Sequence, residues 1–409
     1  MQPAESLAGT WSVAIGWIER FVASRGWRWK LVAGLAVTAS VLSVNPLLYS
    51  SLKPHHDPND ELKWQVVEQQ SRTLLMQPAP DNPGTNEAKR TFRLTVPLLM
   101  KILHLNRYGI VCLQFVASLL FLYFTIRLVE QTTGDRVAAV FAAVGFAFIY
   151  TGSAGLSDAL AWFDEFAYLF ILLAMYSSNV FAIVFFTLAA SWTDERGFIA
   201  CAFVFLWWKL KSLTPARLTP SALLRVDARS TAVLAAMLAY LAGRFSIQAV
   251  TGLHTPHDAT GLHVFLASTN YIGLAVWSAL EGFWVPVLFS LVILIVRRRI
   301  VPLLLLTGLM TVIMIVALSV HDITRSAGYM FPAVFISILV LSESTSGVDP
   351  GGRPPGSLAD LRILLSIAAV ISVLCPSYII VTLWDPAVTW YEPAFIKVLD
   401  LIRIHFYGH

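Results

Sequence analysis

Residues 51–107 read SSLKPHHDPNDELKWQVVEQQSRTLLMQPAPDNPGTNEAKRTFRLTVPLLMKILHLNR and form the longest polar stretch of the chain. Apolar segments joined by short connections make up nearly everything that follows. Loops longer than about 12–15 residues tend to be either functional or disordered, and this one contains two helical patterns. We therefore expect the stretch to be folded and to supply half of an active site. The rest of the chain would be a membrane scaffold that supplies the other half.

The composition requires most of the chain to face lipid or other apolar helices. Of its 409 residues, 57% are hydrophobic and only 13% are charged, whereas soluble domains have about 25% charged residues. The net charge of +4 is small, which argues against nucleic-acid binding. The expected fold class is an all-α polytopic membrane protein with about eleven transmembrane helices, because each crossing needs about 20 apolar residues. A long first external loop carrying interfacial helices completes this architecture.

Three parts follow from the distribution of apolar and polar residues. Residues 1–29 predict a cytoplasmic interfacial helix, because Trp, Ile, Phe and Val alternate there with arginines. Residues 30–384 are expected to form the transmembrane domain, which includes the external loop 50–107. Residues 385–409 contain an amphipathic run and are expected to lie along the outer interface as an external tail.

The charges of the connections predict the orientation. Connections assigned to the cytoplasm carry Lys or Arg, and the triple arginine Arg297–Arg299 is the clearest case. With the N-terminus in the cytoplasm, the long loop and the active site are external, as in an integral protein of the bacterial inner membrane. The apolar runs lie at about 30–49, 108–128, 136–154, 160–176, 178–192, 197–209, 231–249, 271–296, 299–319, 327–343 and 363–384.

Acidic residues recur on the external side of this topology and are candidates for catalysis. An ionisable side chain near the bilayer centre costs about 2.5–3.5 kcal/mol, so carboxylates near the membrane core imply a polar cavity or an ion pair. For any single one of them, a helix cap or a solvated turn is the simpler interpretation. The candidates are Asp57, Asp60 and Glu61 in the long loop, Asp164 and Glu165 before one span, and Asp194 and Glu195 between two short spans.

Basic residues accompany these acids. Arg90 and Arg93 lie three residues apart in a predicted helix from Asn86 to about Leu105, so they would share one face. Guanidinium groups bind phosphate oxygens bidentately, which suits a lipid-linked phosphate. Contact with phospholipid headgroups explains the pair equally well. The further candidates for phosphate binding are Arg196, Arg325, His321 and Tyr329.

A divalent metal ion is an alternative use of the external histidines. His–Asp pairs occur at 56–57, 257–258 and 321–322, and imidazole with carboxylate suits zinc or manganese. Adjacent residues seldom both bind one ion, however, and no HxxxH spacing is present. The sequence therefore assigns no cofactor, and a metal held by His56, His257 and Asp322 stays open.

The layout resembles the GT-C superfamily of membrane glycosyltransferases. The matching segments are HHDPNDE after the first span, NEAKRTFRLTVPLL before the second, SWTDERGFIA between two short spans and HDITRSAGYMFPA before the tenth. The resemblance implies a GT-C-like fold and the transfer of a sugar from a polyprenyl-phosphate carrier to a glycan, lipid or protein acceptor, as in cell-envelope glycan biosynthesis. Membrane lipids would be further partners, and nucleic acid would not.

The resemblance also implies roles for individual residues. A carboxylate, Asp60 first and then Asp57 or Glu61, would take the proton of the acceptor hydroxyl. Guanidinium groups would stabilise the phosphate that leaves. These roles require acids and arginines from separated segments to meet at one leaflet.

Three other classes of function stay open, and a non-catalytic lipid-binding or assembly subunit is the simplest of them. A secondary transporter would also gather charges in a membrane cavity, although it would more often show internal repeats and charges near the midplane. A membrane acyltransferase would use His321 or His56 as its base. Product formation from polyprenyl-phosphate sugars would favour the glycosyltransferase, and ion-coupled uptake into vesicles would favour the transporter.

Overall fold

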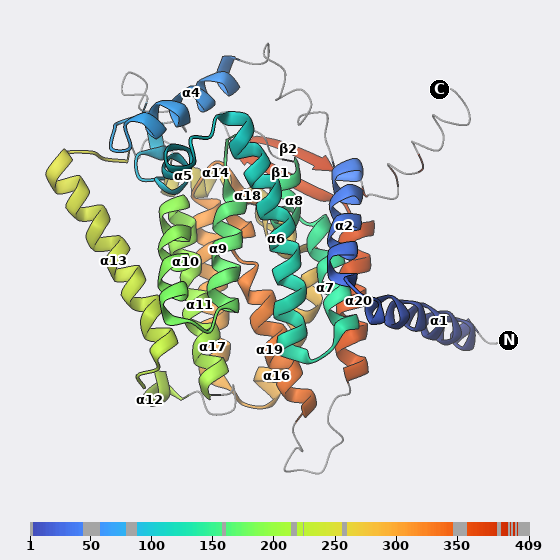
Figure 1. Cartoon of the computed structure of the whole chain (residues 1–409). Coiled ribbons are helices and arrows are strands. Elements are labelled where there is room, and N and C mark those ends of the chain that lie inside the picture. Colours follow the sequence, from blue (N-terminus) through green and yellow to red (C-terminus); the bar gives the residue numbers. More distant parts are fainter. Residues whose placement is uncertain are drawn as a thin grey trace, which may run out of the picture.

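The computed structural model describes residues 3–43, 58–78, 88–157, 161–213, 219–223, 225–255, 260–346, 358–382 and 386–391, with isolated residues beyond them. Helices dominate these ranges and most of them run along one axis, so that they form an elongated bundle (Figure 1). Within the described ranges, one two-stranded antiparallel sheet is the exception.

Five helical segments of the described chain are long and apolar enough to cross a membrane. The chain is therefore a helical membrane protein. The bent pair of α7 (Arg136–Phe148) and α8 (Tyr150–Ser157), with 64° between the two helices, could add a sixth crossing. The eleven crossings expected from the sequence stay a prediction. The five segments are Arg107–Thr133 (α6), Ala228–Thr251 (α13), Leu262–Val296, Ile300–Leu318 (α17) and Ile323–Glu343.

The remaining helices are shorter or are parts of these segments. Leu262–Val296 consists of α14 (Leu262–Ser268), η3 (Thr269–Tyr271), α15 (Ile272–Leu280), η4 (Glu281–Phe283) and α16 (Trp284–Val296). Ile323–Glu343 comprises α18 (Ile323–Gly328) and most of α19 (Pro332–Ser346). The others are α1 (Pro3–Ala23), α2 (Trp27–Ser43), α9 (Asp164–Tyr176), α10 (Val180–Thr193), α11 (Glu195–Leu213), α12 (Pro220–Leu223) and α20 (Leu358–Leu374).

Local sequence signals explain where several helices begin and end. The side chains of Asn106, Asp135 and Asn179 accept hydrogen bonds from backbone N–H groups in the first turns of α6, α7 and α10. Such caps satisfy N–H groups that have no partner within the helix. Gly134 ends α6 in the left-handed conformation at φ 69°, which glycine adopts without strain.

The polar stretch before α6 folds across one end of the bundle. It contains α4 (Pro58–Arg72), the 3₁₀ turn η1 (Ala88–Arg90) and α5 (Thr95–Leu103), and α4 and α5 lie at the same end as α14 and α18 (Figure 1). The first of the two helical patterns expected in this stretch is confirmed as α4. The second is wrong as a single helix, because the chain leaves the helical path between η1 and α5. Arg90 and Arg93 therefore do not share a helix face.

The last apolar run does not stay helical to its end. Helix α20 stops at Leu374, and Ser377–Thr382 (β1) pairs antiparallel with Pro386–Tyr391 (β2). The segment SYIIVT is rich in aromatic and β-branched residues, which favour strands. The expected external tail thus begins with a strand, and most of its amphipathic run lies outside the described residues.

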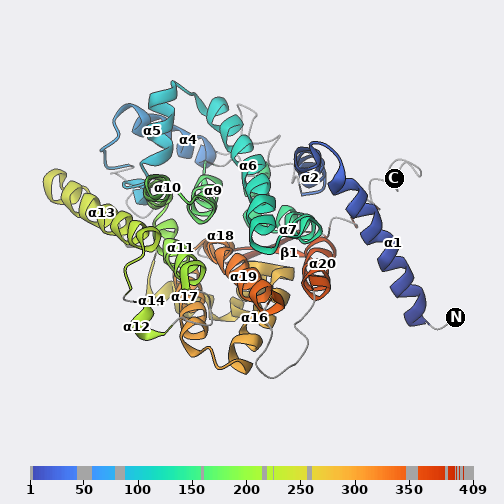
Figure 2. The same ribbon diagram turned by 60° about the horizontal axis from the view of Figure 1, so that its bottom comes forward.

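Two further features frame the molecule. Helix α1 projects sideways from the bundle in both views (Figures 1 and 2), a position compatible with the predicted interfacial helix. The interior holds a cluster of fully buried rings that contact one another in a connected series, and its members are Phe121, Phe146, Phe283, Phe331 and Phe335. Aromatic side chains dominate the energetics of such cores, and these join α6, α7, η4 and α19.

Candidate functional site

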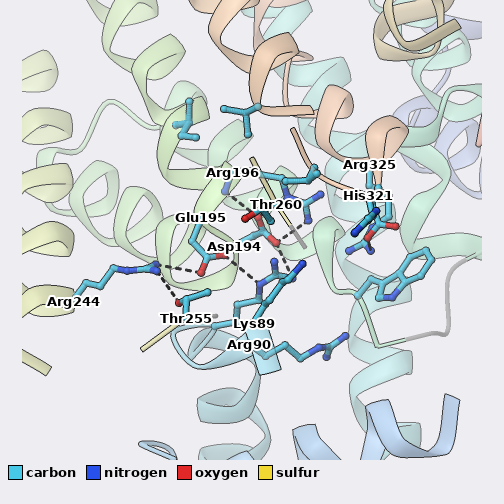
Figure 3. A pocket seen from close by; sticks show the side chains of 16 residues that line it. Lys89, Arg90, Asp194, Glu195, Arg196, Arg244, Thr255, Thr260, His321 and Arg325 are labelled. Carbon is cyan, nitrogen blue, oxygen red and sulfur yellow. Dashed lines mark hydrogen bonds and ion pairs between the residues drawn. The ribbon is translucent and has the colours of Figure 1, made fainter. Parts of the chain in front are cut away.

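A cavity of about 230 Å³ (Figure 3) lies at the end of the bundle that α5 and α18 occupy (Figure 1). Side chains from the segment before α5, the junction of α10 and α11, the end of α13 and the α17–α18 connection line it. Basic residues outnumber acidic ones six to three in this lining, so an anionic ligand fits it best. The lining residues are Lys89, Arg90, Arg93, Trp162, Asp194, Glu195, Arg196, Ile199, Arg244, Thr255, Thr260, Val316, Val320, His321, Asp322 and Arg325.

Asp164 lies behind the lining of the cavity and binds two of the arginines that line it. It is buried in the first turn of α9, where the helix dipole favours a negative charge. Its Oδ1 accepts hydrogen bonds from Arg196 Nη2 at 2.9 Å and from the Tyr329 hydroxyl at 3.0 Å. Its Oδ2 accepts one from Arg325 Nε at 2.7 Å. Because this carboxylate is engaged at both oxygens, it positions the arginines and is poorly placed to take a proton.

Asp194 plays a similar part in the turn between α10 and α11. Arg196 donates to it from Nε at 2.7 Å and from Nη2 at 2.8 Å, and Arg93 Nη1 lies 3.0 Å from its Oδ2. Burial alone would raise the pKa of Asp194, but the neighbouring Arg196 and Arg93 outweigh it and lower the pKa. The carboxylate therefore stays ionised and is a weak base.

Glu195 is held more loosely. Arg93 Nε lies 3.3 Å from its Oε2 and Arg244 Nη1 lies 3.2 Å from its Oε1. Both distances exceed the about 2.7–2.9 Å of strong charge-assisted hydrogen bonds, and 31% of the Glu195 side chain is exposed. Arg244 also donates to Thr255 Oγ1 at 3.1 Å (Figure 3). The ion pairs of Glu195 with Arg93 and Arg244 are therefore the contacts that a ligand can replace with the smallest loss of free energy.

The α17–α18 connection and the first residues of α18 supply another wall of the cavity. Arg325 donates from Nη1 to Asp322 Oδ2 at 2.8 Å and lies 3.9 Å above the ring of Trp162. Its Nη2 is buried and has no hydrogen-bond partner among the described residues. Burial, with help from Lys89, lowers the pKa of His321, so this imidazole is neutral near pH 7. A buried donor without a partner is costly, so Nη2 of Arg325 is available to donate to a ligand in the cavity.

The β-hairpin fixes the backbone beside Arg325. The Thr324 hydroxyl donates to the Tyr378 carbonyl at 2.9 Å and accepts from the Ile380 N–H at 3.1 Å. At the start of β1, the Ser377 hydroxyl donates to Glu281 Oε1 at 2.7 Å. A segment more than fifty residues further along the chain thus holds one wall of the cavity.

Most of the sequence-predicted site residues meet here. The structure brings together two acidic turns, a loop and the α17–α18 connection that are widely separated in sequence. His321 lines the cavity as a neutral group, and Tyr329 contacts the site through Asp164 and through Arg196, whose guanidinium lies 5.1 Å from the centre of its ring. The residues that meet are Asp164, Asp194, Glu195, Arg90, Arg93, Arg196, Arg325, His321 and Tyr329.

Two of the predicted catalytic acids lie elsewhere. Glu61 forms a two-point ion pair with Arg107 at 2.7 and 2.8 Å and does not line the cavity. Glu165 is buried among α6, α8 and α9, where the Gly155 N–H donates to its Oε2 at 3.2 Å. The structure therefore does not bring Glu61 and Glu165 to the cavity, and a catalytic role for either stays a prediction. Asp57 and the side chain of Asp60 lie outside the described residues.

The metal alternative gains no support from the described residues. No group of three His, Cys, Asp or Glu side chains among them could hold an ion. Asp322 pairs with Arg325, and His56 and His257 lie outside the described part of the chain.

Arg244 is the functional candidate that sequence analysis missed. It falls near the end of the apolar run 231–249 and was counted as part of a span. A single cation near the end of an apolar segment is itself a signal, because such charges usually face a cavity or a partner. The neighbouring Trp162 carried no comparable signal.

Comparison of the chain with known protein families, with curated proteins and with solved structures found no match. The chemistry of the site is therefore what bears on function. A wall of guanidinium groups can bind a phosphate or a carboxylate, and Glu195 and Asp322 can accept a proton at its edge.

Proposed function

We propose that the chain is a membrane glycosyltransferase that moves a sugar from a polyprenyl-phosphate carrier to an acceptor hydroxyl, in a GT-C-like fold of about eleven spans. The observation that carries this proposal is the cationic cavity at one end of a bundle of apolar helices. A carrier of this kind has an anionic head and a lipid chain, and the cavity offers basic groups beside helices that contact lipid.

The arginines would act on the leaving group. As the bond between the anomeric carbon and the phosphate oxygen breaks, negative charge grows on the phosphate. The buried Nη2 of Arg325 is available to donate to that oxygen. Arg93 and Arg244 can exchange their long contacts with Glu195 for the phosphate. Donors that gain partners only as charge develops accelerate the reaction rather than merely bind the substrate.

A carboxylate would act as the base. The acceptor oxygen forms a bond to the anomeric carbon from the face opposite the phosphate, its proton passes to the carboxylate, and the carrier phosphate leaves with the bonding electron pair. Among the described carboxylates Asp322 is the best placed, because it lines the cavity and Arg325 contacts only its Oδ2. Glu195 is the second choice. Asp60 and Asp57 of the long loop remain predicted bases, and α4 lies at the same end of the bundle.

The cavity end would face the outside of a bacterial inner membrane, with the N-terminus in the cytoplasm. The distribution of arginines outside the cavity supports this orientation. Arg297–Arg299 lie between α16 and α17 at the end of the bundle opposite to α18 (Figure 1). Lys and Arg in short connections favour the cytoplasmic side.

The test uses purified protein in lipid nanodiscs with polyprenyl-phosphate sugars and hydroxyl acceptors. We expect transfer by the parent, a loss of at least about a hundredfold for Asp322→Asn, and a similar loss for Arg325→Lys, which keeps the charge but not the planar donor group. Asp360→Asn, at an exposed position near the start of α20, is the matched control and should keep parental activity.

Two results would change the proposal. If Asp322→Asn keeps activity and Asp60→Asn loses it, the base lies in the long loop. If no sugar carrier yields product and none binds in an Arg325-dependent manner, the glycosyltransferase is excluded.

A transporter is the second candidate, and the helix breaks favour it. The chain bends between α7 and α8, and Glu281 interrupts the segment Leu262–Val296 at φ 46°. Broken helices are typical of transporter binding sites. The aromatic cluster of Phe121, Phe146, Phe283, Phe331 and Phe335 fills the interior next to these breaks, however. Proteoliposomes should therefore show no ion-coupled uptake of phosphate or sugar phosphate.

A further inference from the structure

The cavity is not polar throughout. Ile199 of α11 and Val316 of α17 line it together with the charged residues, and α11 packs against α17. A wholly polar ligand would make no apolar contact with the side chains of Ile199 and Val316. The apolar part of the lining therefore indicates that the ligand has an apolar portion, which leaves the cavity on this side.

The apolar surface continues along α17 away from the cavity. Val312, Leu309 and Leu305 follow Val316 at spacings of four, seven and eleven residues, which places them on one face of the helix. Val312 is 46% exposed, and Leu309 and Leu305 are half-buried. On α11, Ala202 follows Ile199 at a spacing of three and is also half-buried.

Helix α13 borders the same side of the site. Its Arg244 lines the cavity next to Ile199 and Val316. Only 17% of the most apolar stretch of α13 is buried within the protein. Phe245, directly after Arg244, is 62% exposed. Helix α13 therefore exposes much of its apolar surface to the surroundings on the side where Arg244 lines the cavity.

We propose that the lipid chain of the ligand leaves the cavity along an apolar track formed by Val316, Val312, Leu309 and Leu305 of α17 with Ile199 and Ala202 of α11. The inference rests on the proposed function in that the ligand is a lipid phosphate. It commits the site to one occupant, a single-chain lipid whose phosphate lies among the arginines. At about 1.5 Å per residue, the track on α17 extends about 16 Å from the cavity.

The track selects chains by shape. A lipid chain that moves from the bilayer to the track exchanges one apolar environment for another, so no hydrophobic gain accompanies the transfer. Van der Waals contact is what remains. A bulky residue in the track should therefore act by obstruction, and it should act only on ligands long enough to reach it.

The experiment compares two carriers that share one head group. A long-chain polyprenyl monophosphate and a prenyl monophosphate of one isoprene unit are titrated into the full-length protein in nanodiscs, with inorganic phosphate as the probe of the cavity alone. Val312→Trp should weaken binding of the long chain about tenfold, which corresponds to about 1.4 kcal/mol. It should change the affinity for the short carrier and for phosphate less than about twofold.

The matched control is Val292→Trp on α16, where the parent side chain is 55% exposed and does not line the cavity. This substitution should leave all three affinities unchanged. A long-chain carrier with a photoreactive group in its tail should label α17 in the parent protein, and unlabelled carrier should compete.

Each outcome decides one point. Equal loss of long and short carriers in Val312→Trp, or labelling confined to helices other than α11, α13 and α17, overturns the track. Chain-dependent binding without any sugar transfer supports the track and contradicts the proposed glycosyltransferase. The absence of Arg325-dependent binding for all three probes overturns both.

Discussion

At the residue scale, Asp164 is the point where α9, α11 and the segment of α18 and Tyr329 meet through hydrogen bonds to a single carboxylate. The side chains of Arg196 and Arg325 are nearly buried. Solvent water therefore cannot replace their ion pairs with Asp164. Buried charges that lose their partner are strongly destabilising. The acid therefore matters to the cavity although it need not touch the ligand.

Asp164→Asn tests this dependence. It should lower the free energy of unfolding by about 3–5 kcal/mol and should weaken phosphate binding, because two guanidinium groups lose their common anchor. Thermal denaturation in a mild detergent measures the first effect and phosphate titration the second. Asp360→Asn, at an exposed position near the start of α20, should stay within about 0.5 kcal/mol of the parent. A stable Asp164→Asn protein that binds phosphate normally would show that the arginines are held by other contacts.

The lowered pKa of Asp194 predicts an acid-dependent contribution to stability. Because the pKa of this group is lower in the folded protein than the ordinary value of 3.8, ionised Asp194 stabilises the fold fully above about pH 4. The contribution falls as the pH drops further towards the folded-state pKa, by at most about 1.4 kcal/mol per pH unit.

The melting temperatures of the parent and of Asp194→Asn, measured from neutral pH to pH 3, test this contribution. They should differ most at neutral pH and should converge below about pH 4. A difference that stays constant down to pH 3 would contradict the assignment.

Residue types and positions predicted much of this site. Asp194, Glu195, Arg196 and Arg325 stand out as charges next to apolar runs, and the structure brings them together. The sequence could not predict which acidic side chain forms an ion pair with which arginine. Glu61 looked equivalent to the other acids, yet its partner Arg107 lies 46 residues away in the chain and draws it from the cavity.

At the scale of elements, the break at Glu281–Gly282 depends on a close backbone approach. A Cβ atom on Gly282 would overlap the carbonyl oxygen of Ala368 in α20. Only glycine lets η4 pack against α20 in this way. The break therefore joins two distant helices as well as interrupting one.

Gly282→Ala should destabilise the protein by about 1–3 kcal/mol or more, because the overlap falls on backbone atoms that cannot rotate away. Gly308→Ala in α17 is the matched substitution, since a Cβ there meets nothing within 4 Å. It should be neutral or should stabilise the helix by up to about 1 kcal/mol. Thermal unfolding of both variants decides the question, and equal melting temperatures would refute the close approach.

Elements with strong periodicity were predictable, and irregular ones were not. The helices α6, α13 and α17 lie where the apolar runs predicted them. The strand β1 was not foreseen, because its apolar residues continue the composition of the preceding span and its pairing with β2 is a tertiary contact. The break between η1 and α5 was not predictable for a related reason. The position of Arg93 in this break is determined by its ion pairs with Asp194 and Glu195, which are tertiary contacts, and not by local helix propensity.

At the scale of the whole molecule, the two ends of the bundle differ in what their charges do. One end gathers its charges into a cavity, and the other exposes Arg297 and Arg298 at the α16–α17 connection. If the cavity faces outwards, a cysteine at the exposed position 72 of α4 must be accessible from outside the cell. A cysteine at position 297 must not be.

Labelling of intact cells with a membrane-impermeant thiol reagent tests this orientation. In a Cys112→Ser, Cys375→Ser background, Arg72→Cys should react before permeabilisation and Arg297→Cys only after it. The buried Cys201 should react in neither case. The reverse pattern would place the cavity in the cytoplasm and would remove the support for an external transferase.

The hydrogen bonds between Thr324 and the β-hairpin have a consequence for how the protein is made. A ribosome has joined every residue of the cavity by the time it reaches position 325, but Tyr378 and Ile380 are added more than fifty codons later. Until then, the hydroxyl beside Arg325 has no hairpin to bind. The site thus matures only after β1 has been translated, and a chain stalled after α20 would carry these binding residues in an unfinished arrangement.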